Sequence, residues 1–597
     1  MSRHAQNGRS SGASRTNRTT ANRGAPFSAN PMLAVKLPVW RSRLVLFAMF
    51  VAFAALAGRA MWLQGISNEF LQKQGASRYA RTLELPATRG KITDRHGEVL
   101  ASSVPVKAIW AIPDDVLAAP TDKLRQLAKL LDMPERDLHK KLDSDRNFVY
   151  LKRQVEQPVV NKILALGIPG IETRKEYKRF YPESEAMAHV VGFTNVEDAG
   201  QEGMELSSQK KLAGVTGSRR VIKDRLGRVI EDIGAVREPH DGVDLTLSID
   251  SKIQYIAFSQ LKAAVEKSKA KAGGVVVLDS QTGEVLALAN LPTYNPNDRS
   301  YLTGAQLRNR VMTDTFEPGS TLKPFTIALA LETKRTTPTA IYQTAPGKMT
   351  IGTATIGDSH PHGALTVSQI IQKSSNVGTA KIALQMPAQE MWEMFTTIGF
   401  GQQPKLGFPG AVAGRVRPHK SWRPIEQATM SYGHGISVSL IQLARSYTIF
   451  AREGDVIPLS FVRVTEPPQG QQVISARTAA AMRAMLESVV SPEGTAPKAQ
   501  VPGYRVGGKT GTAYKVVGGR YVNKYVASFV GLAPMSNPRI IVAVMLDEPT
   551  VGGHYGGDVA GPVFAAVTAN ALRSMNVAPD SNITHIIIPP EALEGDL

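Results

Sequence analysis

The sequence predicts an α+β fold in which an antiparallel sheet is flanked by helices, preceded by a β-rich domain and one transmembrane helix. Strand-like runs with turn residues between them occur on both sides of a stretch, about residues 320–485, that has mostly helical patterns. Strands from both ends of a region, with helices between them, favour one antiparallel sheet. A chain of 597 residues also exceeds one typical domain.

Composition changes along the chain divide it into five segments. We expect a disordered basic tail, a membrane helix, a first exported domain that is rich in β-strands, a second exported domain and a short tail, over residues 1–39, 40–63, 64–240, 241–575 and 576–597.

The N-terminal tail accounts for much of the charge. Residues 1–68 contain no Asp or Glu, and the formal net charge of the whole chain is +19. Such a charge fits nucleic acid, an anionic membrane or a polyanionic substrate. The other Lys and Arg residues are scattered and form no patch interleaved with aromatic residues, so we expect no nucleic acid partner.

An uncharged apolar run lies between Arg43 and Arg59. Extending it to Trp40 and Trp62 places two interfacial tryptophans about 33 Å apart, which suits a bilayer. Positive charge before the span predicts a cytoplasmic N-terminus and an exported remainder. The alternative is a cleaved signal peptide, because Ala55-Leu56-Ala57 forms an A-x-A site. Cysteine is absent, so disulfides and cysteine chemistry are excluded.

Within the first exported domain, residues 89–101 predict a hairpin that turns from Asp94 to Gly97. The second domain begins with a short strand and an amphipathic helix that ends near Lys269. It continues with a hairpin and three later strands, at residues 274–279, 284–289, 504–517, 525–533 and 539–546.

Three motifs carry the chemistry: S-x-x-K at Ser320 and Lys323, S-x-N at Ser374 and Asn376, and K-T-G beginning at Lys509. S-x-x-K also occurs at Ser207/Lys210, Ser208/Lys211, Ser259/Lys262 and Ser268/Lys271, and S-x-N at Ser28/Asn30 and Ser574/Asn576. Alone, each motif is most simply a cap, loop or solvated face. Only K-T-G is unique, and the ordered set of three selects Ser320.

A serine hydroxyl needs an adjacent base, and a desolvated lysine can serve as one. Positions i and i+3 share a helix face, so Lys323 can reach Ser320. Ser374 would relay a proton and Asn376 would hold substrate. On a strand, Lys509 and Thr510 suit a substrate carboxylate, while Gly511 admits a ligand to the backbone. The amides of Thr512 and Ser320 would form an oxyanion hole.

These motifs in this order resemble the penicillin-recognising serine transpeptidases and β-lactamases. The flanking sequence is similar to class B penicillin-binding proteins over about residues 40–575, and residues 104–110 most resemble the division-specific branch. The first exported domain corresponds to the pedestal of these proteins, and the second to their catalytic domain. The resemblance of the pedestal rests on residues 89–97, 179–182, 188–192, 202–205 and 214–217. That of the catalytic domain rests on residues 316–325, 373–378 and 556–564.

The resemblance implies a septal D,D-transpeptidase of the inner membrane. Ser320 would attack a D-Ala-D-Ala stem peptide, with Lys323 as base, and an amine of a neighbouring strand would resolve the acyl-enzyme. β-Lactams would acylate the same serine. It further implies divisome partners, including an FtsW-type glycosyltransferase, and no metal or organic cofactor. Residues 64–240 show no glycosyltransferase module of their own.

Two departures from the family pattern stand out: His434, where many relatives have a tyrosine, and Glu183-Ser184, where a glycine is common. His360 and His362 have no third ligand at a metal-binding spacing, so a polar turn is favoured.

Other interpretations remain open. An elongation-type homologue would share every catalytic residue, and a β-lactam sensor would also keep the three motifs. A non-catalytic scaffold of the division machinery belongs to a different class, which intact motifs disfavour. A β-lactamase would have no use for the anchor and pedestal.

Overall fold

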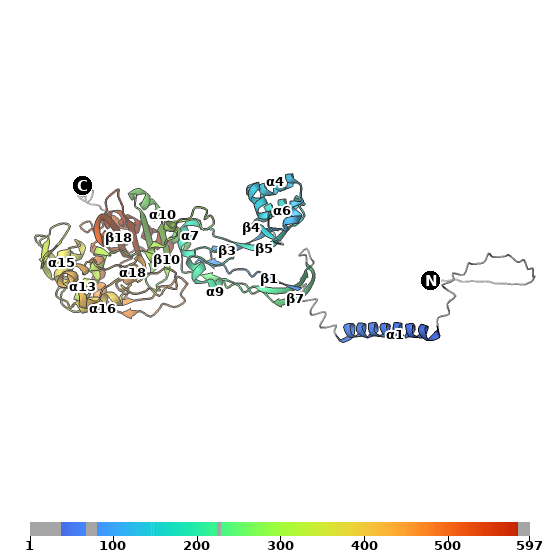
Figure 1. The fold of residues 1–597 in the computed structure, drawn as a ribbon. Coiled ribbons are helices and arrows are strands. Elements are labelled where there is room, and N and C mark those ends of the chain that lie inside the picture. Colours follow the sequence, from blue (N-terminus) through green and yellow to red (C-terminus); the bar gives the residue numbers. More distant parts are fainter. Residues whose placement is uncertain (1–37, 67–79, 145, 147, 224–228, 583–597) are drawn as a thin grey trace, which may run out of the picture. The chain divides into compact units, whose positions relative to one another are not determined.

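The computed structural model of the protein describes residues 38–66, 80–144, 146, 148–223 and 229–582 (Figure 1). It contains two compact units, of which the first comprises residues up to Leu83 together with 220–234, and the second comprises the rest. Each unit is described by itself.

The first unit contains the apolar helix. Helix α1 spans Val39–Met61 and continues as a π-helical turn, η2, over Trp62–Ile66. The stretch Val39–Gln64 is long and apolar enough to cross a membrane, with a mean hydropathy of 2.1 and no buried residue. This agrees with the predicted anchor helix. A three-stranded sheet has the order β1-β6-β7, with bounds Ala80–Leu85, Gly217–Lys223 and Val229–Arg237.

The pedestal part of the second unit is built on β3, Val99–Ala111, which pairs antiparallel with three strands: β2, β4 and β5, over Ile92–Thr93, Val149–Val155 and Ile171–Phe180. The predicted hairpin is confirmed, since the Gly97 amide donates to the Asp94 carbonyl at 3.1 Å. Strand β8, Leu245–Thr246, adds to β2 in parallel.

The pedestal also contains helices that the strand patterns did not predict. A separate apolar core includes Leu127, Leu138, Leu151 and Ile163. It joins β3 and β4 to α3, α4, α5 and α6, over Pro113–Leu117, Thr121–Leu130, Glu135–Leu142 and Gln157–Ala165. Helices α7, α8 and α9 follow at Ser184–Val191, Gly203–Ser207 and Gln209–Leu212.

Three of the pedestal motifs converge on one buried ion cluster. Glu205 is fully buried and accepts from Arg89 Nε at 2.6 Å and from Arg179 Nε at 2.7 Å. The remaining guanidinium nitrogens bond to backbone carbonyls and to side chains of Gln209 and Ser103. Since every charged group is paired, the cluster joins segments that are far apart in sequence.

The catalytic part contains an all-antiparallel sheet in the order β10-β9-β19-β18-β17 (Figure 1). The strands span Val285–Leu291, Ala272–Asp279, Ile540–Asp547, Arg520–Ala533 and Gly507–Val517. Strands from both ends of the domain therefore meet in one sheet, as predicted. Helix α10, Ser251–Ser268, and helix α22, Gly561–Ser574, pack together against it.

Most of the regular elements between β10 and β17 are helices, in agreement with the mostly helical pattern predicted for about residues 320–485. Its α-helices are α11, Gly304–Leu307; α12, Arg310–Thr313; α13, Lys323–Glu332; α14, Val367–Gln372; α15, Asn376–Ala383; α16, Ala388–Thr397; α17, Pro424–Met430; α18, Leu440–Ser446; α19, Thr448–Ala451; and α20, Ala476–Ser488. The 3-10 turns are η3, η4 and η5, at Gly319–Leu322, His419–Ser421 and Pro497–Ala499, and α21 follows β19 at Gly556–Val559.

Three small strand pairs interrupt these helices: β11 with β14, β12 with β13, and β15 with β16. Their bounds are Ile341–Gln343, Ala364–Thr366, Lys348–Ile351, Ala354–Gly357, Asp455–Val456 and Gln471–Gln472.

Candidate active site

Ser320 lies in the 3-10 turn η3, which leads directly into α13. Residues i and i+3 of a 3-10 helix eclipse each other, so Ser320 and Lys323 lie on one face. Gly319 precedes the serine with φ +55°, a backbone conformation that favours glycine. The turn is held by Thr321, whose Oγ1 donates to the Pro318 carbonyl at 2.7 Å and whose carbonyl accepts from the Tyr447 hydroxyl at 2.8 Å.

Lys323 is fully buried beneath the serine turn. Its Nζ donates to the carbonyl of Ser374 and to the Ser374 Oγ, the latter at 3.0 Å. Burial lowers the pKa of Lys323 to about 7, although the charge of Asp358 opposes the shift. A substantial fraction of this amine is therefore neutral near pH 7 and able to accept a proton.

The S-x-N segment connects β14 and α14 to α15. Ser374 has φ +59°, and Ser375 caps α15 by accepting from the Gly378 amide at 2.9 Å. Asp358 fixes this segment, because its carboxylate accepts from Ser375 Oγ at 2.7 Å and from the Val377 amide at 2.9 Å. The side-chain Nδ2 of Asn376 donates to the Gly357 carbonyl at 2.8 Å.

The K-T-G segment lies on β17, where residues 509–512 pair with Val530 to Ala527 of β18. Lys509 is fully buried, and its Nζ donates to Ser374 Oγ at 2.9 Å. Burial, together with the charge of Lys323, lowers its pKa well below the usual value. Gly511 is required sterically, since a Cβ there would lie 2.8 Å from the Pro318 carbonyl oxygen.

The Ser374 hydroxyl therefore lies between two buried amines. It is 3.0 Å from Lys323 Nζ and 2.9 Å from Lys509 Nζ. A hydroxyl has one donor and two acceptor positions. It can accept a hydrogen bond from whichever amine is protonated while donating to the other amine in its neutral form, which is a path for moving a proton between buried groups.

A cleft of about 450 Å³ opens above these groups. Of the predicted site residues, Ser320, Ser374, Asn376, Thr510 and Thr512 line it. Lys323, Lys509 and Gly511 lie beneath. The remaining walls are Asp358, Ser359, His360, His362, Lys373, Tyr432, His434, Glu493, Gly494, Thr495, Pro497, Lys498, Tyr555, Gly556, Gly557 and Asp558.

Several cleft residues were missed as site candidates by sequence reasoning. Asp358 and Tyr432 have no motif that marks them, and Lys498, which pairs with Asp558 at 2.6 Å, lies in an undistinguished turn. Only the structure associates Thr495 with the site, because its Oγ1 is 3.2 Å from Thr510 Oγ1.

Burial separates Ser320/Lys323 from the four other S-x-x-K pairs. Each of the alternative lysines, Lys210, Lys211, Lys262 and Lys271, is exposed to solvent. An exposed lysine keeps its ammonium solvated and is a poor base near neutral pH. Of the alternative S-x-N matches, Ser574 lies at the end of α22, and Ser28 lies outside the described residues.

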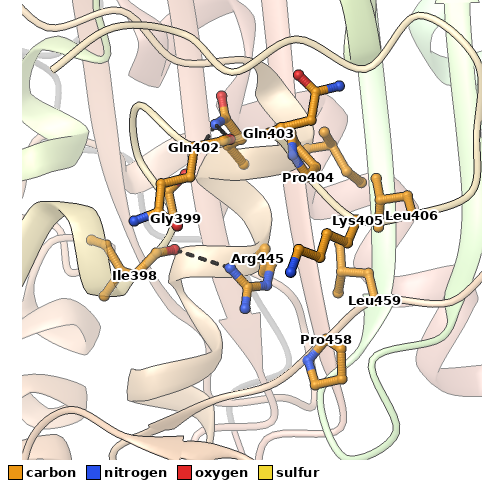
Figure 2. A pocket seen from close by; sticks show the side chains of 12 residues that line it. Ile398, Gly399, Gln402, Gln403, Pro404, Lys405, Leu406, Arg445, Pro458 and Leu459 are labelled. Atoms are coloured by element: carbon orange, nitrogen blue, oxygen red, sulfur yellow. Dashed lines mark hydrogen bonds between the residues drawn. The ribbon is translucent and has the colours of Figure 1, made fainter.

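A second cavity, of about 200 Å³, lies beside the end of α16 (Figure 2). Its charged lining residues are Lys405 and Arg445, and none of its lining residues carries a hydroxyl or thiol. Arg445 donates to the carbonyls of Ile457, at 2.8 Å, and Ile398, at 3.4 Å. The arginine thus joins the end of α16 to the segment at Ile457, and the cavity lacks a nucleophile.

Comparisons with known proteins agree with this geometry. Family models for the penicillin-binding protein transpeptidase domain and dimerisation domain match residues 273–569 and 84–247. The chain is 44% identical to the probable peptidoglycan D,D-transpeptidase PenA of Neisseria gonorrhoeae, over 91% of this chain and 94% of that protein. It is 42% identical to peptidoglycan D,D-transpeptidase FtsI of Escherichia coli K12, over 91% and 93%.

Solved structures give the same result. The transpeptidase domain of Burkholderia pseudomallei penicillin-binding protein 3 is 57% identical, with a TM-score of 0.53, and the match covers 56% of this chain and 98% of that domain. A peptidoglycan synthetase from Bifidobacterium adolescentis is 26% identical, with a TM-score of 0.67, over 85% and 99%.

Proposed function

The chain belongs to the class B penicillin-binding proteins, and we propose that it is a peptidoglycan D,D-transpeptidase whose nucleophile is Ser320. The observation that carries the proposal is the Ser374 hydroxyl, which lies between two buried amines and lines the same cleft as Ser320. The relatives named D,D-transpeptidase, at 42% and 44% identity, support the reaction class.

In the proposed acylation, Ser320 Oγ attacks the carbonyl of the D-Ala-D-Ala bond and its proton passes to Lys323. The C–N bond then breaks, and that proton moves through Ser374 to the departing D-alanine amine. Because the lowered pKa of Lys323 makes the amine available near pH 7, it can act as the general base. The product is an ester on Ser320, which an amine of a second stem peptide converts into a cross-link.

The other site residues have binding roles in the proposal. The amides of Ser320 and Thr512 stabilise the oxyanion, and Asn376 holds the donor peptide. Thr510 and Thr512 line the cleft and receive the terminal carboxylate, whereas Lys509, which is fully buried, donates to the Ser374 hydroxyl from beneath. β-Lactams, which present a strained amide, would acylate Ser320 in the same way.

We place this enzyme at the division septum, anchored by α1 with its N-terminus in the cytoplasm and its catalytic domain in the periplasm. The Arg residues on the N-terminal side of the span support this orientation. An FtsW-type polymerase and other divisome proteins are the proposed partners. An elongation role is the competing interpretation, and a fluorescent fusion at the side wall instead of mid-cell would favour it.

The test of the proposed nucleophile is covalent labelling by a fluorescent penicillin. Ser320→Ala is expected to abolish labelling while the thermal unfolding curve stays unchanged. Ser268→Ala, in an alternative S-x-x-K pair, is the matched control and should label normally. Labelling of Ser320→Ala at the wild-type rate would place the nucleophile elsewhere. Labelling of the wild type without cross-linking of peptide donors would favour the sensor interpretation.

A further inference from the structure

His434 lies where two cavities meet. It lines the cleft that contains Ser320, and it also lines a neighbouring pocket of about 520 Å³. The other walls of that pocket are Tyr514, Tyr521, Val522 and Asn523, from the β17–β18 hairpin. A ligand that occupies this tyrosine pocket therefore approaches the serine cleft past the imidazole.

The turn that carries His434 is fixed against the serine turn. At Gly433, φ is +92°, and a Cβ would lie 2.2 Å from the Gly319 carbonyl oxygen, so the two backbones are in direct contact. The Gly435 amide donates to Glu317 Oε1 at 2.8 Å, three residues before Ser320. The backbone of His434 is thus held at a set position relative to the nucleophile.

The tyrosine pocket has the chemistry of a cation site. Tyr514 and Tyr521 are 46% and 55% exposed, and an aromatic ring face attracts an ammonium group. The Tyr521 hydroxyl donates to both oxygens of Glu317, at 3.0 and 3.1 Å, which brings a carboxylate to the hydroxyl edge of the ring. None of the residues that line this pocket is Lys or Arg.

The imidazole of His434 is suited to receive a proton from such a cation. It packs against Tyr432 and Tyr521, with ring centroids 5.2 and 6.1 Å apart. The charged groups that act on it are Glu317 and Lys323. Burial lowers its pKa, Glu317 opposes that shift and Lys323 adds to it. Within the described part of the chain, neither ring nitrogen is hydrogen-bonded to another residue.

We propose that the tyrosine pocket binds the primary ammonium group of the acceptor stem peptide and that His434 is the base that deprotonates it. This inference rests on the proposed transpeptidase function and adds the acceptor side of the reaction. The location of His434 at the junction of the two cavities, with tyrosine rings and Glu317 on the acceptor side, carries it.

Neutral His434 takes one proton from the acceptor ammonium, which leaves a neutral amine. The amine nitrogen forms a bond to the acyl carbon and the bond from that carbon to Ser320 Oγ breaks. The second amine proton passes to neutral Lys323 and on to Ser320 Oγ, which restores the hydroxyl. One proton remains on His434 and is released to solvent.

The test uses the full chain in detergent micelles with a D-alanyl thioester as donor. The acceptor probe is an N-acetylated tripeptide whose lysine side chain is its single amine, and chromatography separates the aminolysis and hydrolysis products. His434→Gln is expected to lower the ratio of aminolysis to hydrolysis at least about tenfold at pH 7.5. The defect should shrink toward pH 9.5, because more of the acceptor amine is then already neutral in solution and does not need His434 to remove its proton. His419→Gln, whose ring packs on Trp392, is the matched control.

A second pair of variants tests the pocket itself. Tyr521→Leu is expected to raise KM for the tripeptide severalfold with little change in kcat. Tyr521→Phe, which keeps the ring, is expected to raise KM less than Tyr521→Leu does. An unchanged ratio of aminolysis to hydrolysis in His434→Gln would overturn the role of His434, and so would a ratio that falls equally at every pH. A wild type that penicillin labels but that forms no aminolysis product would overturn it as well. A wild type that penicillin does not label would contradict the proposed function itself.

Discussion

Two groups of buried positive charge in the second unit are compensated differently. In the pedestal, Arg89 and Arg179 share the carboxylate of Glu205, and their other nitrogens bond to oxygen acceptors. Beneath the cleft, Lys323 and Lys509 share only a hydroxyl. Arginine stays charged in proteins, whereas lysine loses its proton readily when it is buried. The first group can therefore hold segments together, and the second can exchange protons.

The same comparison explains which features the sequence could predict. The hairpins, the five sheet strands and the apolar helix follow from local patterns, and the structure confirms them. The order of the three motifs identified the set of residues that the structure brings together, although their chemical roles stay predictions.

What the sequence could not predict depends on contacts between distant segments. Asp358 and the convergence of Arg89, Arg179 and Glu205 arise only when tertiary packing places loops beside one another. The helices of the pedestal were missed because they lie between strands whose β-signals dominated the interpretation. Burial of Lys323 is likewise a tertiary property, since the exposed alternatives share its spacing.

The largest expected effect comes from replacing Lys323, the proposed general base. Lys323→Met should lower the rate of penicillin acylation by roughly 10²- to 10⁴-fold, because the general base is lost. It should not lower the free energy of unfolding, since a buried amine is replaced by an apolar side chain of similar length. Thermal unfolding and labelling rates measure the two quantities.

The pH dependence of that stability difference has a definite sign. The pKa of Lys323 falls from 10.5 to about 7 on folding, so the unfolded chain binds more protons between these values. The wild type therefore gains stability as the pH rises through this window, and the advantage of Lys323→Met should shrink. A variant that unfolds more easily at every pH would contradict this comparison.

A smaller effect, on stability alone, is expected in the pedestal. Glu205→Gln leaves two buried guanidinium groups without a carboxylate, which should cost about 3–5 kcal/mol of unfolding free energy. Labelling per folded molecule should stay within about twofold of the wild type, because Glu205 does not line the cleft. Glu135→Gln removes an exposed ion pair with Arg125 and should cost at most about 1 kcal/mol. Equal losses of unfolding free energy in Glu205→Gln and Glu135→Gln would show that the buried ion cluster is no more important for stability than an exposed ion pair.

The smallest effect concerns Asp198, beside the pedestal cluster. Burial raises its pKa from 3.8 to about 6 and outweighs the attraction of Arg89 and Arg179. The folded state thus holds the proton more tightly, so ionisation of this carboxyl increasingly disfavours folding as the pH rises from 3.8 to about 6, and the penalty is complete above that range. Asp198→Asn, which also tolerates the observed φ of +62°, should stabilise the protein at pH 8 by on the order of 1–2 kcal/mol.

That gain should disappear at about pH 3, below the pKa of 3.8 in the unfolded chain and of about 6 in the folded one, where the carboxyl is mostly protonated in both states. Chemical denaturation at the two pH values measures it. A stabilisation that is the same at both would mean that the carboxylate charge is not its source.

Burial outweighs the attraction of Asp358 and makes Lys323 a base near neutral pH. The most direct test is the second-order rate constant for penicillin acylation of the wild-type chain between pH 5 and pH 10. We expect the rate to rise with an apparent pKa of about 7, as the neutral fraction of Lys323 grows. A rate that rises only near 10.5, the ordinary lysine pKa, or that does not change with pH, would contradict it.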